Sequence, residues 1–235
     1  MSAEGALAIV TLQIGGHTLL LLPEKAIFLP EFETLLVADV HIGKATSFRR
    51  LGVPVPHGTT DETLAVLSRL VRRLDAKRIV FLGDFLHARG GRSVDAFTSI
   101  AQWRASHATI DMQIVRGNHD RRAGDPPREV GIACVDGPVL DGRFALTHHP
   151  VGVSGSYALA GHIHPCAVLT GPARQRERLP CFWFGRDVGV LPAFGEFTGC
   201  AEVNAQAGDQ VWVVADETVE LVASSTPTGS RSGDM

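Results

Sequence analysis

The chain has 235 residues, of which 45% are hydrophobic and 20% are charged, with 25 glycines and a formal net charge of −3. This length and apolar fraction are typical of one folded domain, and they exclude a disordered or collagen-like chain. The longest apolar run, near Leu19–Leu22, is far shorter than the ~20 residues that a membrane-spanning helix needs, so no membrane span is expected.

The first residues and the cysteines indicate the cellular compartment. Residues 1–7 lack the basic stretch and the small-residue cleavage site of a secretory signal, so we expect a cytoplasmic protein. The cysteines form no Cys-x-x-Cys pair, which favours reduced packing residues over a zinc ribbon or a disulfide framework. They are Cys134, Cys166, Cys181 and Cys200.

The first half of the sequence predicts alternating strands and helices. Residues 7–37 are short apolar runs broken by glycine and proline, as hairpins are. Leu64, Leu67 and Leu70 recur at helical spacing. Strands are predicted over residues 34–38, 78–82 and 109–115, and helices over 61–74 and 94–107. Because strand and helix alternate, we expect a parallel α/β core with crossover connections.

The second half consists of short strand-like runs separated by Gly/Pro turns. Strands are predicted over residues 143–147, 156–160, 179–184 and 210–214. The residue pattern favours one domain over residues 1–223, with a sheet built from both halves and helices outside it. Residues 224–235, rich in Ser, Thr and Gly, are predicted to form a disordered tail.

Each of five predicted strands ends in a turn that holds possible metal ligands or proton donors. In chain order these are Asp39 and His41, Asp84 and His87, Asn118 with His119 and Asp120, His148 and His149, and His162 and His164. Because the carboxyl ends of strands in an open α/β sheet border one crevice, these turns are expected to meet. These motifs are unlikely to occur together by chance, because the tripeptide Asn-His-Asp alone is expected only about 0.005 times in a chain of this composition.

The types of ligand narrow the chemistry. Carboxylates, imidazoles and an amide carbonyl, without thiolate, suit Mn²⁺, Fe²⁺ or Zn²⁺. Two ions that share a bridging carboxylate would use seven of the residues in these turns, which are too many for one ion. The seven are Asp39, His41, Asp84, Asn118, His148, His162 and His164. Two neighbouring metal ions activate a water molecule as hydroxide and stabilise the attacking and leaving oxygens of an in-line displacement. The pattern therefore indicates hydrolysis of phosphoesters.

The ordered set Asp39-x-His41, Gly83-Asp84, Gly117-Asn-His-Asp120, His148 and Gly161-His-Ile-His164 resembles the calcineurin-like metallophosphoesterase superfamily. The resemblance spans about residues 34–200. It implies an α/β (α+β) fold, a four-layer α/β/β/α sandwich of two mixed sheets flanked by helices.

A narrower resemblance is to the bacterial PdeM subfamily of ligase-associated DNA damage response endonucleases. It is carried by residues 38–50, 83–87, 159–165, 179–183 and 191–199. It implies a manganese-dependent phosphodiesterase that cleaves single-stranded or structured DNA in repair. The implied functional partners are an ATP-dependent DNA ligase, a helicase and a nuclease. The sequence carries no signal for an oligomeric state.

The resemblance also implies a role for each residue of the motifs. One ion would be held by Asp39, His41, Asp84 and His164, and the second by Asp84, Asn118, His148 and His162. A hydroxide between the ions would attack phosphorus, and His119 would protonate the leaving oxygen with Asp120 as its orienting partner. His148 is preferred to its neighbour His149 as ligand because it directly follows the strand.

Other residues near the turns are candidates for substrate binding. Arg49, Arg50 and Arg116 could contact phosphates, and His149 and His87 could contact substrate, although a structural role for His87 is equally compatible with the sequence. Phe194 and Phe197 could stack bases, but aromatic residues beside Pro and Gly are more often core residues. Two alternatives stay open: a phosphomonoesterase or cyclic-nucleotide phosphodiesterase at the same site, and a non-catalytic scaffold for protein partners.

Overall fold

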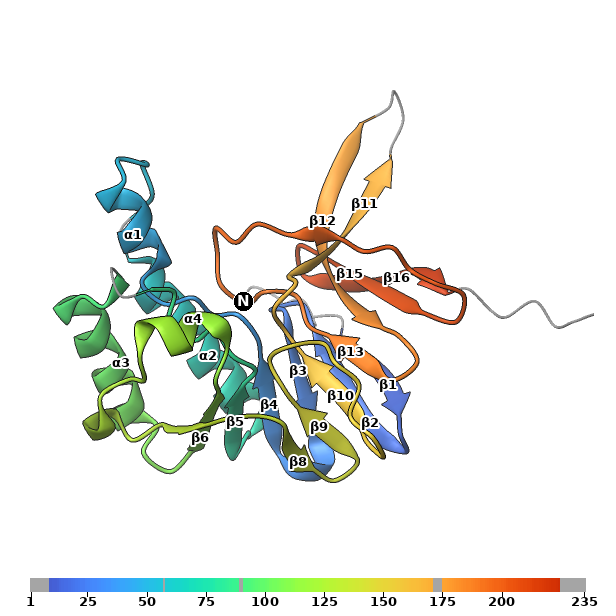
Figure 1. Cartoon of the computed structure of the whole chain (residues 1–235), viewed down its shortest axis with the longest axis horizontal. Helices are drawn as coiled ribbons and strands as arrows, with labels where there is room; N and C mark the ends of the chain where they lie inside the picture. Colours follow the sequence, from blue (N-terminus) through green and yellow to red (C-terminus); the bar gives the residue numbers. More distant parts are fainter. Residues whose placement is uncertain (1–8, 57, 89–90, 171–174, 225–235) are drawn as a thin grey trace, which may run out of the picture.

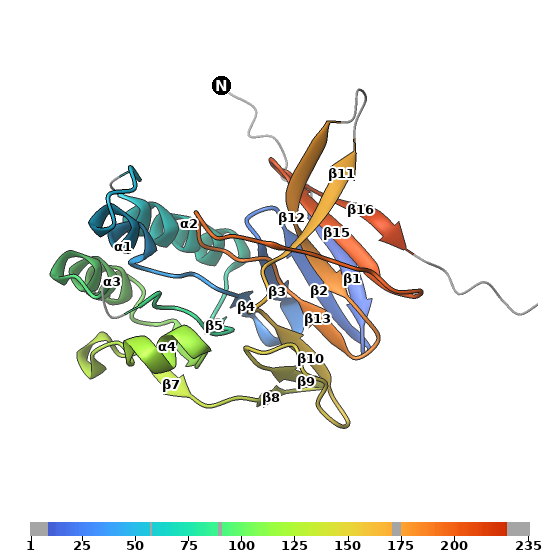
Figure 2. The ribbon, with the colours of Figure 1, turned by 45° about the horizontal axis from the view of Figure 1, so that its top comes forward.

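Two mixed β-sheets face each other in the computed structural model, and α-helices pack against the outer face of the first sheet (Figures 1 and 2). The structure describes residues 9–56, 58–88, 91–170 and 175–224. The predicted pair of mixed sheets is confirmed.

The first sheet is built from residues 10–135 in simple chain order. Its first four strands are antiparallel hairpins, as predicted, and the last four run parallel because α-helical connections separate them. The strands are β1 (Val10–Ile14), β2 (His17–Leu22), β3 (Ala26–Leu29), β4 (Thr34–Val37), β5 (Arg78–Phe81), β6 (Asp111–Val115) and β7 (Ala133–Val135).

The described chain has four α-helices: α1 (Lys44–Arg50), α2 (Thr59–Leu74), α3 (Val94–Ser106) and α4 (Asn118–Ala123). Short 3-10 helices span Pro30–Phe32 and Arg128–Val130. The two predicted helices correspond to α2 and α3, and the predicted stripe Leu64, Leu67 and Leu70 is buried against the first sheet. All four α-helices lie on that side of the sandwich (Figures 1 and 2). In the described residues, therefore, the expected helical layer over the second sheet is missing.

The second sheet is built from residues 139–224. The expectation of one sheet shared by both halves is therefore wrong, because each half forms its own sheet and the two pack face to face. The strands are β8 (Val139–Asp141), β9 (Phe144–Leu146), β10 (Tyr157–Ala160), β11 (Pro165–Thr170), β12 (Arg176–Phe184), β13 (Val188–Val190), β14 (Ala201–Glu202), β15 (Gln210–Ala215) and β16 (Thr218–Ser224).

Two hydrophobic cores follow from the alternation of side chains along the strands. In β4, Leu35 and Val37 face the helices, while Leu36 faces the second sheet. Between the sheets Leu36 packs in a cluster that includes Val80, Phe144 and other fully buried residues. Burial on both faces fixes the ends of β4 and β5, and these ends carry the polar turns of interest.

The cysteines differ from expectation at one pair. Cys166 and Cys200 form a disulfide, with their Cα atoms 5.7 Å apart, whereas Cys134 and Cys181 are free. The parallel pairing of β11 with β14 brings the two cysteines together across 34 residues of chain, which single cysteines in a sequence do not reveal.

Two further predictions concern the tail and a membrane span. Within the described residues, no helix is both long enough and apolar enough to cross a bilayer. Ser224, the first residue of the predicted tail, ends β16, and residues 225–235 lie outside the described residues.

Removal of a side chain between the sheets should destabilise the fold. We expect Leu36→Ala to lower the free energy of unfolding by about 2–5 kcal/mol, because Leu36 is fully buried and the cavity left behind cannot close completely. Urea denaturation measures this loss. The control Leu140→Ala, at a residue that is 66% exposed, should change stability by less than about 0.5 kcal/mol, and equal effects of the two substitutions would contradict this assignment of the core.

Candidate metal centre

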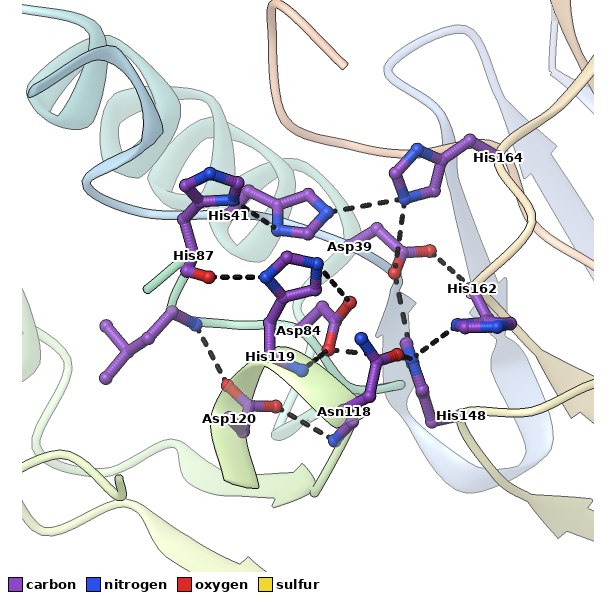
Figure 3. Close-up of polar contacts among 12 residues, drawn as sticks. Asp39, His41, Asp84, His87, Asn118, His119, Asp120, His148, His162 and His164 are labelled. Atoms are coloured by element: carbon purple, nitrogen blue, oxygen red, sulfur yellow. Dashed lines mark hydrogen bonds and ion pairs between the residues drawn. The ribbon is translucent and has the colours of Figure 1, made fainter. Parts of the chain in front are cut away.

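The polar turns that follow the strands meet at one end of the sandwich (Figure 3). Five of their residues have left-handed backbone: Asp39 (φ 53°), His41 (51°), Asp84 (51°), His162 (77°) and His164 (49°). This conformation costs a residue with a Cβ atom roughly 1–2 kcal/mol and persists where the surroundings enforce it. Such a concentration of strained residues is typical of a functional site.

Hydrogen bonds to two carboxylates hold these turns together. Asp39 Oδ2 accepts from the backbone N–H of His162, and Asp84 Oδ1 accepts from that of His119, both at 2.8 Å. The backbone N–H of His41 also donates to the Asp84 carbonyl at 2.9 Å. The turns after β4, β5, β6 and β10 thus form one hydrogen-bonded assembly.

Glycines make this close approach possible at two positions. A Cβ atom on Gly161 would collide with Asp39 Oδ2, and one on Gly117 would collide with Asp84 Oδ1. Only glycine leaves room for the carboxylates there. The glycines of the two motifs therefore set the positions of the carboxylates.

One cluster of possible ligands contains Asp39, His41 and His164. The Nδ1 of His164 lies 2.9 Å from the Gly199 carbonyl, which can only accept, so this nitrogen carries the proton. In the neutral ring the lone pair is then on Nε2, which lies 3.5 Å from Asp39 Oδ1 and 3.3 Å from His41 Nε2. Three ligand atoms converge on one point.

A second cluster surrounds His148, which is buried. Its Nδ1 donates to the Leu82 carbonyl at 3.0 Å, so in the neutral ring the lone pair is on Nε2, which faces the centre. That Nε2 lies 3.1 Å from Asn118 Oδ1, 3.1 Å from His162 Nδ1 and 3.5 Å from Asp84 Oδ1. Its neighbour His149 is exposed, although its ring contacts that of His162 with centroids 4.3 Å apart. The geometry favours His148 at this position.

Burial keeps several of these imidazoles neutral. Burial lowers the pKa of His41 to about 2, helped by the charge of Lys44. Burial and the charge of His148 also lower the pKa of His162. Burial also raises the pKa of the Asp84 carboxyl. Burial would lower the pKa of His164, but the Asp39 carboxylate, 3.5 Å from its Nε2, outweighs burial and raises it. Neutral imidazoles are the form that binds metal ions.

The residues present fit divalent cations. Around His148 Nε2 and His164 Nε2, the facing atoms are carboxylate oxygens, an amide oxygen and imidazole nitrogens, which are the atoms that bind divalent cations in proteins. Asp39 Oδ1 is buried and has no hydrogen-bond partner. Asp39, Asp84 and His148 also lie together, so the two carboxylates connect the clusters. Carbonyl groups behind the imidazoles supply the outer contacts that orient metal ligands.

His119 lies beside both clusters with one ring nitrogen turned to the centre (Figure 3). Its Nδ1 donates to the His87 carbonyl, and its Nε2 lies 3.9 Å from Asp84 Oδ2. The rings of His87 and His119 stack with centroids 5.0 Å apart. Burial, with the charges of Lys44 and His119, lowers the pKa of His87 to about 4. The His119 side chain is 31% exposed and can reach a substrate.

Comparison with known proteins identifies the family. Residues 32–150 match the model of the calcineurin-like phosphoesterases. The chain belongs to this family. The nuclease MPE of Pseudomonas putida has 41% sequence identity and a TM-score of 0.81, over 91% of this chain and 100% of that chain. The phosphoesterase Yfce of E. coli has 13% identity and a TM-score of 0.39, over 81% of this chain and 96% of that chain. No curated protein matches the chain.

The structure of this phosphoesterase brings together the residues that the sequence singled out as ligands, and it places His119 and His87 beside them. Their assignment to two ions stays a prediction. The predicted ligands that meet are Asp39, His41, Asp84, Asn118, His148, His162 and His164.

Asp120 differs from its predicted role as partner of the His119 ring. Its carboxylate accepts hydrogen bonds from the backbone N–H groups of Leu86 (2.9 Å) and Gly117 (3.0 Å), and it is buried. The His119 ring is oriented by the His87 carbonyl instead. Asp120 sits one helical position after His119, so its side chain points to the interior while the imidazole points to the centre.

Arg116 forms ion pairs within the chain. Its guanidinium forms two hydrogen bonds to Asp125, at 2.8 and 2.7 Å, and an ion pair with Asp136 at 3.4 Å. These ion pairs orient the guanidinium, and a phosphate contact from Arg116 stays a prediction. Arg49 donates to the Pro56 carbonyl at 2.7 Å, in the segment after α1, and to Thr46 of the same helix. Phosphate contacts from Arg49 and Arg50 stay predictions.

Sequence reasoning missed three contributors to the site. Lys44 lies near the centre, three residues after His41, and its position within the motif is the one signal that could have found it. The carbonyls of Leu82 and Gly199 orient imidazoles, and backbone contacts of this kind leave no trace in residue types.

A methyl group at position 161 should displace Asp39. We expect Gly161→Ala to weaken Mn²⁺ binding at least about tenfold, because the new Cβ atom occupies the space of the carboxylate. Isothermal titration calorimetry measures the affinity. The control is Gly152→Ala, where a Cβ atom meets its nearest neighbour at an ordinary 4.0 Å. Unchanged affinity in Gly161→Ala would show that this contact does not position the ligand.

Loss of the Asp120 carboxylate should weaken the fold. Asp120→Ala leaves two backbone N–H groups without their acceptor, so we expect the free energy of unfolding to fall by about 2 kcal/mol or more. Urea denaturation of the metal-free protein tests this, with the exposed Glu217→Ala as control. Wild-type stability of Asp120→Ala would contradict the structural role.

Proposed function

We propose that this protein is a divalent-metal-dependent phosphodiesterase that cleaves DNA internally. The observation that carries the proposal is the convergence of imidazole nitrogens and carboxylate oxygens from five separate turns, beside a histidine whose second ring nitrogen faces the same place. The likeness to nuclease MPE over 91% of this chain supports a nucleic acid as substrate.

The proposal assigns the ligands to two cations, with Asp84 shared and Mn²⁺ as the preferred ion. Asp39, His41, Asp84 and His164 would hold the first, and Asp84, Asn118, His148 and His162 the second. When bound, these cations supply Lewis-acid activation of water and neutralise charge on the phosphate. The ligand set, which lacks thiolate, also suits Fe²⁺ or Zn²⁺.

His119 supplies the proton that the leaving group needs. The leaving oxygen of a phosphodiester is a sugar alkoxide, which is a strong base and leaves poorly without a proton. His119 Nδ1 is committed to the His87 carbonyl, so Nε2 is the nitrogen that exchanges this proton at the site. His87 thus positions His119 through its backbone and its stacked ring.

The biological setting in our proposal rests on the sequence resemblance. It comprises DNA repair in the cytoplasm beside an ATP-dependent DNA ligase, a helicase and a nuclease. Arg49 and Arg50 of α1, with His149 at the exposed edge of the second cluster, would contact the DNA strand.

A panel of substrates tests the proposal. Labelled single-stranded, duplex and hairpin DNAs, a phosphomonoester and a simple diester are incubated with Mn²⁺, Mg²⁺, Zn²⁺ or a chelator. We expect internal cleavage of DNA with Mn²⁺ and none with the chelator. Turnover of the phosphomonoester alone would contradict the proposal and favour a phosphomonoesterase. Less than one ion per chain after Mn²⁺ reconstitution would favour a scaffold.

His119→Ala tests the proton donor. We expect the rate of DNA cleavage to fall about 10²- to 10⁴-fold, because the alkoxide then leaves without a proton. The loss should be much smaller on thymidine 5′-(p-nitrophenyl phosphate), whose p-nitrophenolate leaves as an anion. His107→Ala, in the cap of α3, is the matched control. Equal losses on the two substrates would contradict a role in protonation.

A further inference from the structure

The chain between β13 and β14 extends from the second sheet toward α1 and α2 in both views (Figures 1 and 2). Residues 193–200 of this connection, which we call the bridging loop, are tied to ligand turns at both ends. At one end Phe194 N–H donates to the Ala38 carbonyl at 2.9 Å, and Gly195 N–H donates to the Asp39 carbonyl at 3.1 Å. At the other end the Gly199 carbonyl accepts from His164 Nδ1.

The bridging loop presents Phe197 to solvent. Phe194 is 5% exposed and belongs to the core under the helices, whereas the Phe197 side chain is 47% exposed. The two phenylalanines that the sequence could not separate therefore have different environments. Phe197 borders a small cleft whose other walls include the ligand His41, Lys44 and Thr60.

The backbone at Phe197 is held in an unfavourable conformation. Its φ of 59° is left-handed, which is rare for a bulky residue. Its neighbours hold it there, since Glu196 forms an ion pair with Lys25 at 3.0 Å and Thr198 Oγ1 donates to the Gly195 carbonyl at 3.3 Å. The disulfide at Cys200 fixes the end of the bridging loop. Phe197 is thus presented on a restrained support.

The exposed half of this ring gains no stabilisation from burial. A half-exposed phenylalanine with a strained backbone, directly beside candidate metal ligands, is therefore a candidate for contact with the substrate. The matching group on the substrate is flat and apolar and lies next to an anion, because Lys44 borders the same cleft while the carboxylate of Glu196, which also lines it, is paired with Lys25. A nucleobase next to a phosphodiester has this combination of properties.

We propose that Phe197 is a stacking platform for the nucleobase that flanks the phosphodiester held at the metal centre. This inference rests on the proposed function and adds a determinant of specificity to it. A base can stack on a protein ring only when it is unpaired or turned out of a duplex. Phe197 therefore makes the site select unpaired nucleotides over regular duplex DNA.

Kinetics on matched oligonucleotides test the platform. The substrates are a single-stranded DNA and the same strand with abasic nucleotides on both sides of the cleaved bond. The variants are Phe197→Ala, Phe197→Trp and Phe197→Asn, the last because asparagine accepts left-handed backbone while it lacks the ring. Leu140→Ala, at another exposed apolar residue, is the control. Thermal melting confirms that each variant is folded.

We expect Phe197→Ala and Phe197→Asn to raise KM for the single strand about tenfold, as the loss of one base stack does, with a small effect on kcat. The increase should vanish on the abasic strand, and Phe197→Trp should keep the wild-type KM. Unchanged KM on the single strand, or an equal increase on both strands, would overturn the inference while DNA cleavage by the wild type stands. If the wild type cleaves no DNA, the proposed function fails and the inference fails with it.

Discussion

The site depends on two buried carboxylates that hold the turns together and also face the candidate ligands. Asp39 uses Oδ2 to accept the backbone N–H of His162 and leaves Oδ1 without a hydrogen bond, facing His164. Asp84 makes both kinds of contact with one oxygen: Oδ1 accepts the backbone N–H of His119 and lies 3.5 Å from His148 Nε2. One set of contacts joins chain segments that are distant in sequence, and the other points at the centre. The same side chains therefore assemble the fold locally and supply ligands.

This arrangement couples the site to the packing of the two sheets. Asp39 follows β4 of the first sheet, and His162 follows β10 of the second, so their hydrogen bond crosses the sandwich at its functional end. Leu36 and Ala38, which precede Asp39 in the same segment, both pack between the sheets. Because protein interiors are close-packed, this segment has little freedom to shift. The packing between the sheets therefore sets where the carboxylate can reach the turn after β10.

The sequence is informative where a residue's place follows from local pattern. Three predicted elements correspond to β4, β5 and α2, namely the strands 34–38 and 78–82 and the helix 61–74. They could be predicted because the spacing of apolar residues indicates which faces of an element are buried. The pattern cannot show that each half forms its own sheet, or that Cys166 meets Cys200, because pairing between distant strands leaves no local signal. The same holds for the carboxylates that pair with Arg116.

The bridging loop orients a candidate metal ligand and also positions Phe197. The Gly199 carbonyl fixes the proton on His164 Nδ1 and so directs Nε2 to the centre, while Phe197, two residues earlier, borders the cleft beside His41. Both depend on the same short segment, which hydrogen bonds tie to Ala38 and Asp39. In our proposal a displacement of this loop would therefore alter the ligand geometry and the base contact together. Phosphodiester and nucleobase would then be positioned by one restrained element.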